Sequence, residues 1–184
     1  GKSSRMGTDK ALVIFENKPF IQCVAEAFKE VFVRVIIISD HRDRYKFMGL
    51  PIYPDIYKKC GPLGGIHAAL QYARTGAVFV GSCDIPLVQP VLVRRILRSS
   101  LNGFDCVIGS VDGVMQPLFG LYKRSCMRAI EKNLQNEVNS VSDIPEKPLH
   151  LLMRNSYRFA IFLLLLPNLK HVSSTLNYIS KTAN

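Results

Sequence analysis

The stretch VFVGSCDIPLV, residues 78–88, combines a strongly apolar run with an abrupt stop. Its opening is typical of a strand buried on both faces of a sheet. Asp84 follows that run, and Pro86 has no backbone N–H with which to continue a strand ladder. In open α/β sheets ligands bind at the carboxyl ends of the strands, so Asp84 is a candidate ligand of a phosphate-bound metal. The alternative is an ordinary turn-forming aspartate.

Other apolar runs alternate with segments of helical periodicity. The expected strands are RVIIIS (34–39), DCVIGS (105–110), PLFGLY (117–122) and FAIFLLLLP (159–167). Helices are expected over 20–31, 63–74, 91–99 and 125–134, and residues 135–148 are expected to form a loop. Because alternation favours right-handed βαβ units, we predict an α/β three-layer sandwich, with a mostly parallel Rossmann-like sheet and helices on both faces.

Composition limits the class of protein. With 184 residues and 48% hydrophobic content, residues 1–184 are expected to form a single domain. The five cysteines show no C-x-x-C spacing, which predicts neither a disulfide framework nor a zinc site and favours the cytoplasm. The longest apolar run is much shorter than the roughly 20 residues of a membrane span. A net charge of +10 indicates an anionic partner, which can be a nucleic acid, a membrane surface or a phosphorylated small molecule.

The opening segment GKSSRMGTDKA, residues 1–11, is suited to phosphate binding. Glycines let a loop direct its backbone N–H groups at phosphate oxygens, and Lys10 adds a neutralising charge. The Walker pattern is not met, because Thr8 and Asp9 separate Gly7 from Lys10. The alternative is a frayed basic terminus. Since the chain lacks an initiating methionine, we expect further residues before Gly1.

Two further segments offer polar groups next to predicted strands or helices. GPLGGIHAAL, residues 61–70, suits a base edge or a phosphate, or else a simple glycine-rich connection, and its His67 is expected to be structural. ISDHRDRYKFMGLPIYPD, residues 38–55, carries Asp40, His41, Arg42 and Asp55, which can read a nucleobase edge or form a solvated loop.

In this order the segments resemble the molybdenum cofactor guanylyltransferases, relatives of the nucleotide-sugar transferases. The family opens with a signature similar to L-A-G-G-x-x-x-R-M-G-x-D-K, and Gly1 takes the place of the second glycine of the pair. The resemblance continues through SDHRDRY, GPLGGIHAAL, CDIPLV and QPLFGLY, and covers roughly residues 1–135. It implies that a first glycine and a strand precede Gly1.

The resemblance implies a role for each matching residue. It assigns catalysis to Arg5, Lys10 and Asp84, with Asp84 holding Mg²⁺. The implied nucleotide-binding residues are Gly1, Gly7, Lys10, His41, Asp55, Gly65 and Asp84. Relatives often carry asparagine where His41 stands. The segment LPNLKHVSSTLNY, residues 166–178, lacks the acidic residue of the family's N-x-N-T-P-x-D-like segment, which leaves Asn168 as a candidate polar contact and predicts no second metal ligand there.

The reaction implied by the resemblance is GMP transfer from GTP to the molybdopterin cofactor, with release of pyrophosphate. Molybdenum-cofactor maturation proteins are implied as partners, and neither nucleic acid nor membrane is. A cytidylyl- or sugar-nucleotide transferase of the same fold is one alternative. A non-catalytic phosphate- or nucleic-acid-binding module is another, although the basic residues form no compact run and aromatic residues are not interleaved with them as stacking platforms would require.

Overall fold

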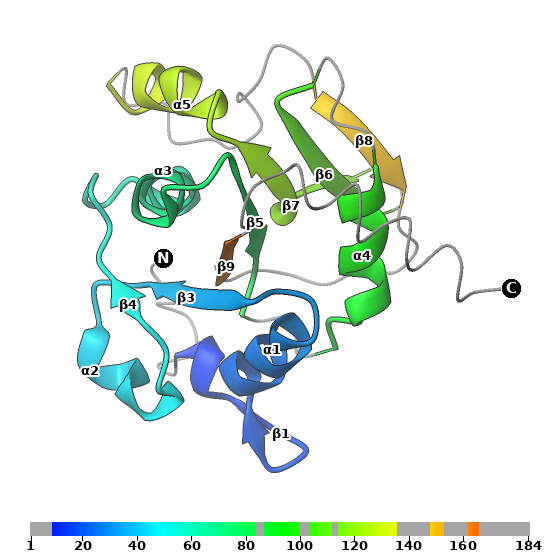
Figure 1. Cartoon of the computed structure of the whole chain (residues 1–184). Coiled ribbons are helices and arrows are strands. Elements are labelled where there is room, and N and C mark those ends of the chain that lie inside the picture. Colours follow the sequence, from blue (N-terminus) through cyan, green and yellow to red (C-terminus); the bar gives the residue numbers. More distant parts are fainter. Residues whose placement is uncertain are drawn as a thin grey trace, which may run out of the picture.

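The computed structural model describes residues 9–83, 87–99, 104–111, 114–135, 148–152 and 162–165. Its main sheet has the order β4-β3-β9-β5-β7-β6-β8 (Figure 1). The strands are β3 (Arg34–Ile38), β4 (Ile52–Tyr53), β5 (Ala77–Gly81), β6 (Cys106–Val111), β7 (Val114–Lys123), β8 (Pro148–Leu152) and β9 (Phe162–Leu165). All five apolar runs of the sequence therefore contain strands. The sequence reasoning did not predict β8, which begins at the end of the expected loop; residues 136–147 of that loop lie outside the described ranges.

Four longer helices accompany the sheet, close to the predicted positions. They are α1 (Phe20–Lys29), α3 (Gly61–Ala73), α4 (Pro90–Arg98) and α5 (Cys126–Gln135). Proline occupies the first turn of α3 and of α4, where its missing N–H has no partner in the helix to lose. Helix α3 begins two residues earlier than predicted, so the glycines of GPLGG form its first turns. None of the helices in the described ranges is long and apolar enough to cross a membrane.

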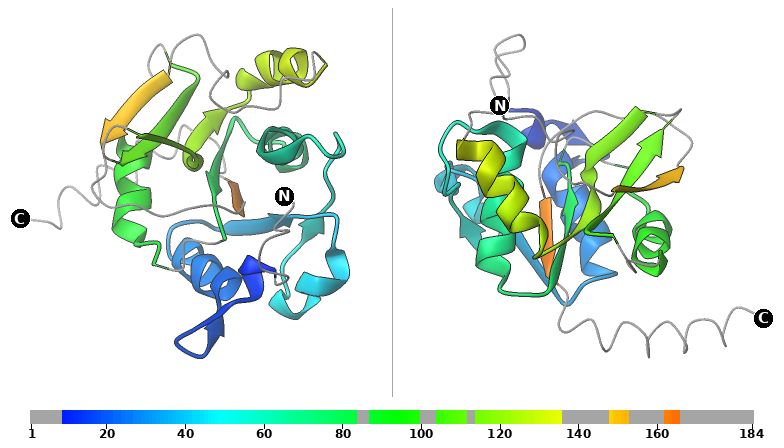
Figure 2. Two further views of the ribbon diagram at one scale, coloured as in Figure 1. Left: turned by 180° about the vertical axis from the view of Figure 1, so that it is seen from behind. Right: turned by 90° about the horizontal axis from the view of Figure 1, so that it is seen from above.

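The helices cover both faces of the sheet, α3 and α5 on one side and α1 and α4 on the other (Figure 2). Alternation along β3 explains this division. Ile36 and Ile38 join the core beneath α3 and α5, whereas Val35 and Ile37 join the core beneath α1 and α4. Successive side chains of a strand point to opposite faces, so an uninterrupted apolar strand needs a helical cover on each side.

The sheet is mixed, which corrects the prediction of a mostly parallel sheet. Parallel pairing occurs in β3–β4 and β6–β8, whereas β3–β9, β5–β9, β5–β7 and β6–β7 are antiparallel. Only residues 112 and 113 separate β6 from β7. A parallel pair needs a crossover of a dozen or more residues, so two strands this close along the chain pair as a hairpin.

Three strands end at the same edge of the sheet. Strands β3 and β4 are parallel, and β3 and β5 both run antiparallel to β9, which lies between them. The carboxyl ends of β3, β4 and β5 therefore lie along one edge, and the chain leaves them through residues 39–41, 54–60 and 82–83. The opposite edge holds the amino ends of these strands.

A short N-terminal unit precedes this sheet. A 3₁₀ turn, η1 (Lys10–Leu12), leads into a two-stranded hairpin of β1 (Ile14–Phe15) and β2 (Lys18–Pro19). Glu16 and Asn17 both have positive φ, 48° and 65°, as a two-residue hairpin loop of the favoured hand requires. Further along, α2 (Arg42–Tyr45) and η2 (Lys46–Met48) follow β3.

Gly81, the last residue of β5, allows α1 to pack closely on the strand. A Cβ at this position would lie 2.7 Å from Cε2 of the fully buried Phe28, and closer still to its Cζ. We expect Gly81→Ala to lower the free energy of unfolding by about 1–3 kcal/mol, the usual effect of overpacking a core. Thermal or denaturant unfolding measures the loss.

The matched test is to combine Gly81→Ala with Phe28→Leu. The smaller side chain removes the ring that the new methyl group meets, so the double variant should be more stable than the sum of the two single losses predicts. Strict additivity would show that the two positions do not compete for this space.

Candidate functional site

The candidate site lies where β3 and β4 end. Asp40, just after β3, forms an ion pair with Lys58, and its Oδ1 also accepts a hydrogen bond from the backbone N–H of Asp55, at 3.2 Å. The hydrogen bond from Lys58 holds the pKa of Asp40 below its usual range. These contacts join the loop after β3 to the loop over residues 54–60.

Asp55 is the unusual group of this cluster. Its Oδ1 is buried and has no hydrogen-bond partner among the described residues. Burial, followed by the charge of Asp40, raises the pKa of Asp55, while Lys58 opposes the shift. A buried carboxylate oxygen without a donor is unfavourable, and a ligand N–H that reached it would satisfy it.

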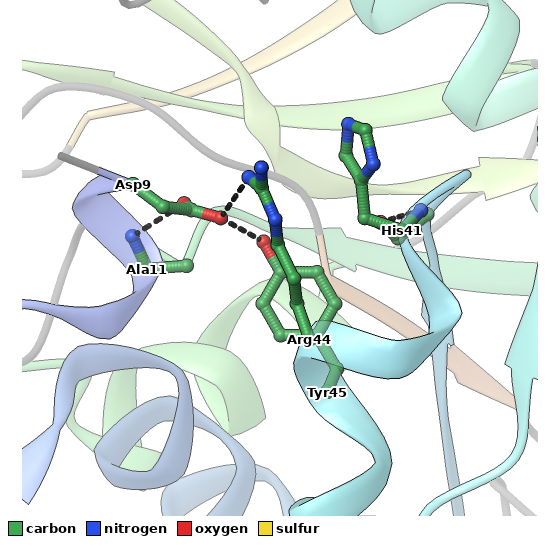
Figure 3. Close-up of polar contacts among 6 residues, drawn as sticks. Asp9, Ala11, His41, Arg44 and Tyr45 are labelled. Carbon is green, nitrogen blue, oxygen red and sulfur yellow. Dashed lines mark hydrogen bonds and ion pairs between the residues drawn. The ribbon is translucent and has the colours of Figure 1, made fainter. Parts of the chain in front are cut away.

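A second junction connects residues 9–11 to α2 (Figure 3). Asp9 Oδ1 accepts a hydrogen bond from the backbone N–H of Ala11 at 3.2 Å, and its Oδ2 accepts one from the hydroxyl of Tyr45 at 2.7 Å. Arg44 Nη1 lies 3.4 Å from the same Oδ2. These contacts bring η1 against α2, the segment that directly follows His41.

Lys10 and His41 are exposed at this junction. Lys10 begins η1, between Asp9 and the buried Ala11. The backbone N–H of His41 donates a hydrogen bond to Ser39 Oγ at 3.1 Å. Figure 3 shows the imidazole of His41 just before α2, and the guanidinium of Arg44, within α2, directed toward Asp9. The junction thus presents cations and an imidazole to solvent, groups that suit an anionic or heteroaromatic ligand.

The first turns of α3 pack closely against the backbone of the loop over residues 54–60, which carries Asp55. A Cβ at Gly64 would lie 2.9 Å from the carbonyl oxygen of Tyr57, so no larger residue fits there without movement of the loop. The ring of His67 meets that of Tyr57 edge-to-face, with centroids 4.8 Å apart. His67 Nε2 lies 3.2 Å from Glu131 Oε1 on α5. His67 is buried, in agreement with the structural role expected for it.

Several predicted site residues lie together at this edge, and others are outside the described residues. The structure places Asp40, His41 and Asp55 in the loops after β3 and β4, Lys10 in η1 against α2, and Gly65 buried in α3. The predicted site residues outside the described ranges are Gly1, Arg5, Gly7, Asp84 and Asn168. In the described ranges, no three histidine, cysteine or acidic residues converge as a metal site would require.

Sequence reasoning missed three residues that organise the site: Asp9, Tyr45 and Lys58. Asp9 stood in the quoted opening segment, but its partner lies 36 residues further along the chain. Lys58 pairs with an aspartate 18 residues earlier. No local pattern marks either contact, because each depends on how two loops meet at the sheet edge.

This chain is similar in sequence to known proteins over most of its length. The family model described as "MobA-like NTP transferase domain" matches residues 1–147. A protein of Pelotomaculum thermopropionicum named "Probable molybdenum cofactor guanylyltransferase" is 38% identical over 143 residues, which cover 78% of this chain and 69% of the relative. A protein of the same name from Clostridium perfringens strain 13 is 36% identical over 142 residues, 77% of this chain and 71% of the relative.

Solved structures show the same fold. Molybdopterin-guanine dinucleotide biosynthesis protein A from Archaeoglobus fulgidus superimposes with a TM-score of 0.67 at 21% identity, over 83% of this chain and 79% of that one. Rv0371c of Mycobacterium tuberculosis H37Rv, in complex with manganese, gives a TM-score of 0.58 at 14% identity, over 80% and 82% of the two chains. At these identities the likeness concerns the fold alone.

Proposed function

Since this chain belongs to the MobA-like NTP transferase family, we propose that it transfers GMP from GTP to molybdopterin that carries molybdenum. An oxygen of the terminal phosphate of molybdopterin attacks the α-phosphorus of GTP. The new P–O bond forms as the bond to the bridging oxygen of the β-phosphate breaks, and pyrophosphate leaves. The relatives named as molybdenum cofactor guanylyltransferases support this choice of substrates.

The observation that carries the proposal is the edge shared by β3, β4 and β5. Asp40, His41 and Asp55 lie in the loops that follow β3 and β4 at this edge. The hydrogen bond between Asp9 and Tyr45 holds the backbone next to Lys10 against α2. Chain segments that are distant in sequence thus supply an unpaired buried acceptor and an exposed cation at one end of the sheet. A nucleoside triphosphate requires both kinds of group, one for its base and one for its phosphates.

Nucleotidyl transfer does not require the protein to form a covalent bond with either substrate. Its residues must bring two anionic substrates into line and neutralise charge at the reacting phosphorus. We assign this neutralisation to Arg5 and Lys10, and the +10 net charge of the chain favours the approach of both substrates.

A divalent cation fits the chemistry of the donors at this edge. Mg²⁺ is commonly bound by one or two carboxylates together with substrate phosphates and water, so it does not need a cluster of three protein ligands. Asp84 is the residue we propose to hold it, because in the sequence it directly follows Cys83 and comes three residues after the end of β5. When bound, the ion supplies charge neutralisation on the triphosphate.

We propose that Asp55 reads the guanine base. The N1–H and the exocyclic amino group of guanine are adjacent donors, and an ionised carboxylate offers two acceptor oxygens to match them. The buried Oδ1 of Asp55, which no described residue satisfies, is suited to one of these bonds.

Replacement of Asp55 by asparagine tests this role. We expect the KM for GTP to rise about 10- to 100-fold, the equivalent of one hydrogen bond to a charged group. The amide offers one donor and one acceptor, which match the C2 carbonyl and N1–H of xanthine, so XTP should become the better substrate. Steady-state kinetics with both nucleotides measures the change, and an unaltered GTP preference would contradict the assignment.

The pKa of Asp55 predicts a pH dependence for the same contact. Because the pKa is raised in the folded protein, Asp55 accepts hydrogen bonds at both oxygens only above that raised value; as the pH falls through it, one oxygen gains a proton and no longer accepts a guanine N–H. The KM for GTP should therefore increase on the acid side at a pH above the ordinary aspartate range, and Asp55→Asn should lack this increase.

The test of the function is a GTP titration with and without Mg²⁺, followed by turnover with molybdopterin as acceptor. A panel of GTP, CTP, UTP and ATP gives the base preference. Mg²⁺-dependent formation of pyrophosphate and the guanine dinucleotide, with GTP preferred, is the expected result. Preference for CTP or UTP would instead assign a cytidylyl- or sugar-nucleotide transferase of the same fold.

A further inference from the structure

We infer that Tyr45 is a positioning residue that fixes residues 9–11 through Asp9 and so sets where Lys10 presents its charge. The inference rests on the proposed function. Tyr45 is 8% exposed, although the three residues that precede it in α2 and the residue that follows it are exposed. Its hydroxyl donates a 2.7 Å hydrogen bond to Asp9 Oδ2 (Figure 3). Tyr45 thus connects the buried core to Asp9.

Asp9 in turn holds the backbone on the C-terminal side of Lys10 by two hydrogen bonds. Its Oδ1 accepts the N–H of Ala11, and its backbone carbonyl accepts the N–H of Leu12 at 2.9 Å. Ala11 is itself 2% exposed and belongs to the core beneath α1 and α4. The main chain of Lys10 is therefore fixed on both sides, while the side chain of Lys10 remains exposed.

The hydroxyl of Tyr45 matters more to this anchor than the nearby Arg44 does. The guanidinium of Arg44 is half exposed and lies 3.4 Å from Asp9 Oδ2, and solvent-exposed ion pairs contribute little. A tyrosine hydroxyl in a buried position that donates to a carboxylate makes a stronger, shorter bond. Burial and the hydrogen bond to Asp9 raise the pKa of Tyr45 further above neutrality, so the hydroxyl stays a donor throughout the working pH range.

Loss of this one hydrogen bond should affect nucleotide binding although the hydroxyl need not touch the nucleotide. Without it, Asp9 is free to leave α2, and the segment of Lys10 can shift relative to the loops that carry His41 and Asp55. A shift of Lys10 weakens its contact with the phosphates, and a tenfold loss of affinity corresponds to about 1.4 kcal/mol. We expect Tyr45→Phe to raise the KM for GTP about tenfold, with a smaller change in kcat.

A matched control separates positioning from a general loss of stability. Tyr122→Phe also removes one hydroxyl, which donates a 2.5 Å hydrogen bond to the carbonyl oxygen of Pro117, from a fully buried ring on β7. Both variants should unfold at a lower temperature, but only Tyr45→Phe should raise the KM. Hydrogen exchange should accelerate at the backbone amides of residues 11–13 in Tyr45→Phe and not in Tyr122→Phe.

A double-mutant cycle tests the route through Asp9. Tyr45→Phe and Asp9→Asn should be strongly non-additive in the KM for GTP, because each one breaks the same connection. With an active wild-type protein, an unchanged KM in Tyr45→Phe, an equal rise in Tyr122→Phe, or additivity in the cycle would each overturn the inference. A wild-type protein that neither binds nor turns over GTP refutes the proposed function, and this inference falls with it.

Discussion

Asp84→Ala is expected to reduce Mg²⁺-dependent GTP turnover by about 10²- to 10³-fold, the loss typical of one preorganised electrostatic group at a reacting centre. Strand β5 ends at Gly81, and the buried Ser82 and Cys83 continue from it along the edge where β3 and β4 also end. A carboxylate that follows at once is suited to hold a cation on the triphosphate. The variant should also need far more Mg²⁺ for half-maximal activity, which a metal titration measures.

Asp105→Ala is the matched control for Asp84→Ala. Asp105 also flanks a strand of the sheet, but it precedes β6, which runs parallel to β5 because both pair antiparallel with β7. Asp105 therefore lies at the opposite edge, where its Oδ1 accepts a hydrogen bond from Ser125 Oγ at 2.5 Å. Removal of this aspartate should lower stability slightly and leave the metal dependence unchanged. Wild-type activity in a folded Asp84→Ala variant would refute the metal-binding role.

Lys10→Ala is expected to produce the second large loss, about 10²-fold in kcat/KM for GTP. The backbone of Lys10 is fixed between Asp9 and Ala11 while its side chain remains exposed, so the substitution removes a charge without disturbing the core. Because the substitution removes a cation that attracts the phosphates, the activity that remains should depend less on ionic strength. Steady-state kinetics at two salt concentrations measures both effects.

Lys132→Ala provides the comparison for Lys10→Ala. Lys132 is an exposed lysine on α5, a helix that contacts α3 and lies away from η1 in Figure 1. Its loss changes the net charge by the same amount, so a general effect of charge on substrate approach would appear in both variants. Similar kinetics in the two variants would contradict a specific role for Lys10.

The positions of the five apolar strands followed directly from the sequence, but their directions did not, and β1, β2, β4 and β8 were not predicted. Apolar runs such as RVIIIS and AVFVG are too hydrophobic for a surface element, so each one had to be covered on both faces. Parallel pairing was inferred from the alternation of strands and helices. That rule fails for β6 and β7, where a connection of two residues leaves only the antiparallel arrangement.

In the candidate site, too, some residues could be named from the sequence, whereas their contacts could not. Asp55 could be named from the sequence because it lies in a polar loop next to a predicted strand, and Lys10 because it ends a glycine-rich basic segment. Neither the unpaired, buried state of Asp55 Oδ1 nor the pairing of Asp40 with Lys58 could be inferred, since both depend on the fit of two loops against α3. The resemblance to a family supplied roles for residues, but not their contacts.

The sequence alone determined where the four longer helices and the five apolar strands lie, and which polar groups follow those strands, because these depend on residues that are neighbours along the chain. Only the tertiary structure decided that Asp9 meets Tyr45 and that Asp40 and Asp55 share a junction. These contacts join residues 36 and 15 positions apart, and the second forms because the parallel strands β3 and β4 bring their loops to one edge. Hydrophobic pattern is a local property of the chain, whereas hydrogen bonding between loops depends on the geometry of the whole sheet.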